Sequence, residues 1–186
     1  MSLLRLLRPG SALGMSAFAI ASAGCSDSAP APAQGAFTAR FGNAIGVACP
    51  ATTPSAQLQV GSFQGNQHVP VVDGEDGAAV SCTVAPYQDG FTASGNIQLG
   101  NSSFYMSGVK LGGSLPNEGV VVLSGPNTVG AYSPADGSTC SFTVTSIEAG
   151  RVWASFRCPH VVVPGKSGSD CNVDDGIVVL ENCSTE

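Results

Sequence analysis

The chain has 186 residues, of which 43% are hydrophobic, 11% charged and 6% aromatic, and its formal net charge is −6. Apolar content this high with so few charges excludes intrinsic disorder, and the 24 Gly follow no strict triplet period, which excludes collagen. The negative charge argues against nucleic-acid binding, because such proteins need a basic surface to neutralise phosphates. About 160 residues remain after an N-terminal leader, enough for one domain with its own core.

Residues 1–24 have the pattern of a secretory signal peptide. Arg5 and Arg8 form a positive N-terminal region, an apolar run covers residues 12–23, and small residues lead up to Cys25. The run is too short to span a bilayer as a permanent helix. The sequence therefore predicts an exported protein.

Two cleavage sites compete at the end of this leader. Residues 21–23, Ala-Ser-Ala, suit ordinary signal peptidase, whereas residues 22–25, Ser-Ala-Gly-Cys, resemble the lipobox of bacterial lipoproteins, with Ser in the place usually held by Leu. Seven Cys is an odd number, and assigning Cys25 to lipid leaves six that can all pair. A lipoprotein is therefore favoured over a plain secreted protein, with acyl chains on Cys25 holding the chain at a membrane. By the same resemblance, Ser26 rather than Asp after the Cys favours the outer membrane over the inner one.

Residues 25–36 are expected to form the lipidated Cys and a tether. Residues 26–35 read SDSAPAPAQG, a Pro/Ala/Ser stretch that cannot bury an apolar face and would act as a semi-stiff spacer. Residues 37–186 are then expected to form a single β-domain.

The domain shows alternating apolar and polar residues, and no sustained helical period. The alternation is clearest over residues 80–84, 91–99, 140–145 and 151–158, and further strands are expected at 38–48, 57–63, 102–111, 118–124 and 176–182. Glu148-Ala149-Gly150 lies between two of these strands and is expected to form a three-residue hairpin loop, with Gly150 in the left-handed position. About nine or ten short strands separated by turns predict an all-β fold, an antiparallel β-sandwich or open barrel held together by disulfides.

Six Cys remain in the exported part and are expected to form disulfides: Cys49, Cys82, Cys140, Cys158, Cys171 and Cys183. No Cys-x-x-Cys pair is present, which argues against a zinc site. Fifteen connectivities are open to six Cys. Cys158 and Cys171 are neighbours along the chain, and this pair ranks first because it would close the Pro/Gly/Ser-rich loop between them.

Two stretches carry a resemblance to known families. The run from Val71 to Cys82 and the terminal segment ending in Cys183 resemble the small β-rich lipoprotein antigens of mycobacteria, and this resemblance implies a disulfide between Cys82 and Cys183. Residues 78–183, with Cys-Thr-Val, Cys-Ser-Phe-Thr-Val, Trp-Ala-Ser-Phe-Arg-Cys-Pro and Glu-Asn-Cys in this order, more closely resemble uncharacterised lipoproteins of high-GC Gram-negative bacteria. That second resemblance implies no activity.

Catalytic and metal-binding candidates are few. His68 and His160 are the only His residues, and neither has a Ser in a Gly-x-Ser-x-Gly turn to act on, so no catalytic residue is assigned. Residues 170–181 have the spacing of a twelve-residue calcium loop, with candidate ligands Asp170, Asn172, Asp174 and Glu181. The loop departs from that pattern because Asp175 holds the sixth place, which requires Gly, and a turn at residues 174–176 before a final strand is favoured over calcium.

One candidate ligand face remains. Alternation over residues 151–158 places Arg151, Trp153 and Arg157 on the side opposite Val152, and Trp153 is the only Trp in the chain. An aromatic ring between guanidinium groups can stack on a sugar ring or meet an anionic group, although an Arg lying over Trp on a solvated sheet face explains the same pattern. The sequence thus favours a non-catalytic cell-envelope lipoprotein that binds an envelope glycan or a protein partner. An exported hydrolase or carbohydrate-active domain is the alternative.

Overall fold

The computed structural model describes residues 30–51, 57–65 and 67–186. Of the two units into which the chain divides, Ala31–Glu186 holds all of these residues except Pro30. The leader and Cys25 lie outside the described residues, and so do their predicted cleavage and lipidation. Within the described ranges, no helix is long and apolar enough to span a membrane.

The unit is all-β, as predicted. Its strands in chain order are β1 (Gln34–Asn43), β2 (Gln57–Val60), β3 (Ser62–Gln64), β4 (Gln67–Val69), β5 (Val71–Val72), β6 (Ala78–Tyr87), β7 (Gly90–Leu99), β8 (Ser102–Leu111), β9 (Glu118–Ser124), β10 (Ser133–Pro134), β11 (Cys140–Glu148), β12 (Arg151–Val162) and β13 (Cys171–Glu181). Six of them, β1, β6, β7, β8, β12 and β13, run for ten residues or more. Consecutive strands such as β6 and β7 pair over their whole length. Each strand therefore keeps its backbone hydrogen bonds and its alternation of inward and outward side chains from end to end.

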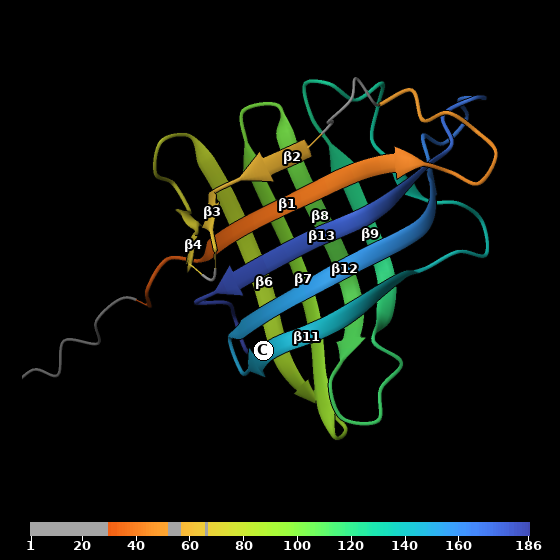
Figure 1. Ribbon diagram of the computed structural model, residues 1–186. Helices are drawn as coiled ribbons and strands as arrows, with labels where there is room; N and C mark the ends of the chain where they lie inside the picture. Colours follow the sequence, from red (N-terminus) through yellow and green to blue (C-terminus); the bar gives the residue numbers. More distant parts are fainter. Residues whose placement is uncertain (1–29, 52–56, 66) are drawn as a thin grey trace, which may run out of the picture. The chain divides into compact units, whose positions relative to one another are not determined.

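A single curled antiparallel sheet forms the half-barrel, so the open barrel rather than the sandwich describes this fold. Its strand order is β2-β1-β13-β12-β11-β9-β8-β7-β6, with β5 beside β1 and β10 beside β12. In Figure 1, β1, β13, β12 and β11 lie in front of β6, β7, β8 and β9 and cross them. A separate hairpin, β3–β4, forms the small second sheet.

The core lies between these two halves of the sheet. Phe104 is at its centre, with ring centroids 5.4 Å from Phe37 and 5.7 Å from Phe156, and all three side chains are buried. The inward side chains of β12 are Val152, Ala154, Phe156 and Cys158, each at most 1% exposed. This confirms the predicted facing of that strand and places Arg151, Trp153 and Arg157 on the outer side.

β1 begins at Gln34, and so the last three residues of the expected tether, Gln34, Gly35 and Ala36, are strand. Gly35 faces the core so closely that a Cβ there would lie 2.7 Å from Ile97. The Pro/Ala/Ser composition predicted a tether up to residue 36, but the strand begins earlier, because Gly35 packs closely against the core.

The predicted three-residue loop at residues 148–150 is one residue shorter in the structure, because Glu148 pairs with Arg151 and leaves Ala149 and Gly150 as the turn. Gly150 has φ +81°, the left-handed conformation that the turn was expected to require.

Three disulfides join all six Cys, which confirms the framework but not the first-ranked pair. Cys171 bonds to Cys49 and Cys158 to Cys140, so the predicted Cys158–Cys171 bond was wrong. β11 and β12 are neighbours in the sheet, and this pairing brings Cys140 beside Cys158, whereas Cys171 lies at the start of β13, beside the end of β1. Cys82 bonds to Cys183, as the resemblance to the mycobacterial antigens implied.

Candidate functional site

The outer side of β12 is the centre of the candidate site. Register places Ser141 beside Arg157 and Thr143 beside Ser155 on one flank. On the other flank, Ile177 of β13 is beside Ser155, and Thr38 of β1 is next in the same row. Because paired residues of an antiparallel sheet point to the same side, these side chains share one face, rich in hydroxyl groups.

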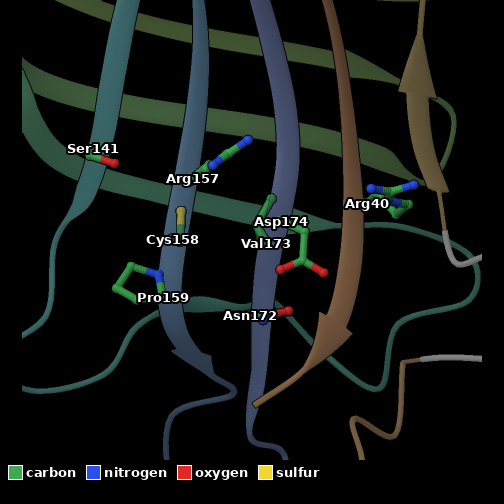
Figure 2. A pocket seen from close by; sticks show the side chains of 8 residues that line it. All are labelled: Arg40, Ser141, Arg157, Cys158, Pro159, Asn172, Val173 and Asp174. Atoms are coloured by element: carbon green, nitrogen blue, oxygen red, sulfur yellow. The ribbon is translucent and has the colours of Figure 1, made fainter. Parts of the chain in front are cut away.

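Three hollows lie along this face and share walls. The first, of about 490 Å³, is lined by Arg40, Ser141, Arg157, Cys158, Pro159, Asn172, Val173 and Asp174 (Figure 2). The second, of about 340 Å³, shares Ser141 and Arg157 with the first, and the third, of about 390 Å³, shares Ser155 with the second. The row of these three neighbouring hollows on the outer side of β12 is named the β12 trough, with Trp153 at one end and Arg157 at the other.

Trp153 lies at the aromatic end of the trough. Its ring is 5.6 Å from that of His68 in an edge-to-face contact, and His68 is in turn 5.1 Å from Phe63. The indole Nε1 donates a hydrogen bond of 3.0 Å to Glu181 Oε1. These contacts hold the indole at one place on the sheet, where it borders the third hollow together with His68.

The β3–β4 hairpin explains why His68 is there. Val179 and Ala36 pair in the row of Trp153 and so point outward, yet they are 1% and 0% exposed. Gly61, just before the hairpin, approaches so closely that a Cβ on it would lie 2.8 Å from the Cβ of Ala36. The hairpin therefore covers this part of the outer face and carries His68 onto Trp153.

The three residues of the predicted ligand face are not equivalent. The Arg151 guanidinium forms an ion pair of 3.1 Å with Glu148 and lies 5.5 Å from the centre of the Trp153 ring. This is the solvated Arg–Trp contact that the sequence left open as the alternative explanation. Arg157 is exposed at the far end of the trough, and among the described residues no carboxylate lies within 4.0 Å of its guanidinium. The structure thus separates Arg151, which has an ion-pair partner, from Arg157, which has none among the described residues.

The segment with calcium-loop spacing is a strand. Residues 171–181 are the strand β13, so Asp170 and Glu181 are separated by about 36 Å of extended backbone. Asp170 Oδ1 instead lies 2.8 Å from His160 Nε2, and Glu181 accepts the bond from Trp153. Pairing with β1 and β12 on both sides keeps the segment extended, and across the described ranges no group of three or more His, Cys, Asp or Glu is placed to hold a metal ion.

The favoured turn at residues 174–176 is a β-bulge. Asp175 pairs with Arg40 and Val173 with Phe41, which leaves Asp174 as an extra residue without a partner in β1. The bulge exposes both Asp174 and Asp175, and it puts the Asp174 carboxylate into the first hollow. Figure 2 shows Arg157 reaching from β12 toward β13, the Asp174 carboxylate beside β13, and Arg40 on the far side of β1.

Sequence reasoning missed Arg40 and the hydroxyl residues of β11 as site residues. Phe37, Ala39 and Phe41 alternate with Thr38 and Arg40, so the facing of Arg40 was readable from the sequence. Its position two strands from Arg157 was not readable, because it depends on the order β1-β13-β12. Scans of this chain against protein-family models, curated proteins and solved structures find no match.

Proposed function

We propose that this protein is a non-catalytic, lipid-anchored envelope protein that binds a saccharide along the β12 trough. The observation that carries the proposal is the order of the lining residues along the three neighbouring hollows, from Trp153 at the aromatic end through a row of hydroxyl groups to Arg157. Sugar rings present C–H groups on their faces and hydroxyls at their rims. An indole with hydroxyl and guanidinium donors nearby complements both parts of such a ligand.

Ser155 is the residue to change, because it belongs to both the second and the third hollow. Ser155→Phe would fill the middle of the trough. The matched control is Ser107→Phe, the same change at an exposed position of β8, outside the residues that line the trough. Isothermal titration of both variants with a panel of neutral and acidic oligosaccharides tests the proposal.

We expect one or more oligosaccharides to bind the wild type and Ser107→Phe with equal affinity, and to bind Ser155→Phe at least tenfold more weakly. Equal binding by Ser155→Phe, or no binding by the wild type across the panel, contradicts the proposal. Shorter products appearing on prolonged incubation would instead support the hydrolase alternative, and that outcome would remove the non-catalytic part.

The lipid anchor has its own test. Intact-mass measurement of the protein from membrane fractions should give a chain that begins at Cys25 and carries acyl mass, with an outer-membrane fraction as its source. Cys25→Ser should move the protein to the soluble fraction, because the acyl chains on that Cys supply the membrane affinity. A soluble wild-type product that begins at Gly24 contradicts the anchor and leaves the trough proposal standing.

A further inference from the structure

The basic end of the β12 trough has two guanidinium groups without ion-pair partners. In the part of the chain that the structure describes, neither Arg40 nor Arg157 has a carboxylate within 4.0 Å, although both line the first hollow. Only β13 separates their strands, so their backbones are about 10 Å apart. Arg presents several N–H donors in a planar fork that matches a carboxylate, and an exposed Arg without a partner is available to a bound anion.

Asp174 lies between the two Arg residues in this hollow. Asp175 is the cross-strand partner of Arg40 on the same face, so two carboxylates balance the two guanidinium groups at neutral pH, and Arg157 is the guanidinium available to an acid group. Asp174 accepts hydrogen bonds and donates none, so it suits ligand hydroxyls and repels a second acid group. The hollow therefore has complementary groups for one acid group with neighbouring hydroxyls.

The opposite end of the trough has a different chemistry. Trp153 and His68 present aromatic rings there, and Arg151 beside them is paired with Glu148. Trp153 and Arg157 are four residue steps apart along the extended strand β12, which is about 13 Å. The distance suits a short oligosaccharide lying along the strand.

We propose, on the basis of the saccharide-binding function above, that the β12 trough binds an acidic oligosaccharide in one direction. The carboxylate of a uronic acid lies at Arg157, on the other side of Asp174 from Arg40. A neutral sugar ring lies against Trp153. The hydroxyl groups of Ser141, Thr143 and Ser155 contact the part of the ligand between these ends.

Trp153 is the only Trp in the chain, so intrinsic fluorescence reports directly on one end of the trough. The probes are a trisaccharide with one terminal glucuronic acid and two neutral sugars, and the same trisaccharide with that acid methyl-esterified. We expect the acid to change the emission and to bind at least tenfold more tightly than its ester. Raising the salt concentration should weaken binding of the acid and leave binding of the ester unchanged.

Arg157→Gln should weaken binding of the acid at least tenfold and change binding of the ester by less than twofold. Arg40→Gln should weaken binding of the acid by a smaller factor, because Arg40 is two strands away from Arg157 and has the Asp175 carboxylate as its cross-strand partner. The matched control is Lys110→Gln, which removes one positive charge on β8, where Lys110 lies 5.0 Å from the Tyr87 ring. It should leave both affinities unchanged.

The outcomes separate this proposal from the function on which it rests. Equal binding of acid and ester, unchanged in Arg157→Gln but lost in Ser155→Phe, overturns the acidic preference and keeps the saccharide trough. A loss of acid affinity in Lys110→Gln equal to that in Arg157→Gln overturns the assigned site, because net charge alone would then explain binding. No response to either probe, together with no binding across the oligosaccharide panel, overturns both proposals.

Discussion

Trp153 Nε1 donates a hydrogen bond of 3.0 Å to Glu181 Oε1, and this bond joins the outer side of β12 to the last residue of β13. An N–H group bonded to a carboxylate is held more firmly than one bonded to a neutral acceptor. The orientation of the one indole in the chain therefore depends on a residue that does not line the trough.

Glu181→Ala should release the indole. We expect stronger acrylamide quenching of Trp153 fluorescence, severalfold weaker saccharide binding, and a loss of stability of about 1 kcal/mol or less, because the pair is partly exposed. Glu181→Gln keeps an acceptor at the same place and should stay close to the wild type in all three measurements. Quenching of Glu181→Ala identical to that of the wild type would show that the packing of His68 alone holds the ring.

Tyr132 has a buried hydroxyl without a hydrogen-bond partner in the structure. Its ring packs on Phe41 with centroids 4.9 Å apart, so the aromatic contact survives when the oxygen is removed. Tyr132→Phe should therefore stabilise the protein by about 1 kcal/mol, since an unsatisfied buried polar group costs about 1–3 kcal/mol. Urea unfolding at pH 7 measures the change, and a destabilised variant would contradict the absence of a partner.

The same hydroxyl predicts a pH dependence. Burial raises the pKa of Tyr132 above its ordinary value of about 10, because the charged phenolate is poorly solvated inside the domain. The unfolded chain therefore loses this proton at a lower pH than the folded one, and stability falls as the pH rises above about 10. Tyr132→Phe lacks this group and should lose less stability between pH 9 and 11 in the same urea experiment. Parallel curves for the two proteins would contradict the shift.

Gly176 lies under the ring of Phe156. A Cβ at this position would lie 2.4 Å from Phe156 Cζ, well inside contact distance. Gly176→Ala should destabilise the protein by about 1–3 kcal/mol, the usual cost of overpacking a core, measured by urea unfolding. In a Phe156→Leu background the same change should cost less, because the ring that it meets is gone. An equal cost in both backgrounds would place the strain elsewhere.

The Cys82–Cys183 disulfide ties the end of the chain to the edge strand β6. Ser184 O accepts a bond of 2.9 Å from Val84 N, and Ser184 N donates one of 3.0 Å to Cys82 O. The disulfide spans 101 residues, for which the chain-entropy estimate is about 4.7 kcal/mol, against about 3 kcal/mol for Cys140–Cys158 with its 18 residues. Replacing Cys82 and Cys183 by Ala should expose the Val84 amide to rapid hydrogen exchange. Replacing Cys140 and Cys158 should leave that amide protected. Rapid exchange of the Val84 amide only in the variant without Cys140 and Cys158 would contradict the role given to the Cys82–Cys183 disulfide.

The sequence by itself determined the all-β class, which side chains of β12 face inward, and that all six Cys form disulfides, although not with which partners. Alternation is a local property, because each residue of a strand points opposite to the one before it, and so Val152 and Trp153 could be placed on their sides from spacing alone. Only the tertiary structure decided which strands are neighbours. Cys158 bonds to Cys140 rather than to Cys171, and Arg40 shares a hollow with Arg157, because both relationships depend on strand order.

The segment from Asp170 to Glu181 is a second case in which a local sequence pattern did not predict the structure. Its acidic spacing suits a calcium loop when read alone, but β1 and β12 bond to it on both sides and extend it into β13. Backbone pairing along a whole strand outweighs a local preference for a turn, because each unpaired buried N–H or C=O would carry its own cost. The turn predicted at residues 174–176 is a β-bulge in the structure. The bulge places Asp174 between Arg40 and Arg157. These three residues are far apart in the sequence, and sheet pairing brings them together at this end of the trough.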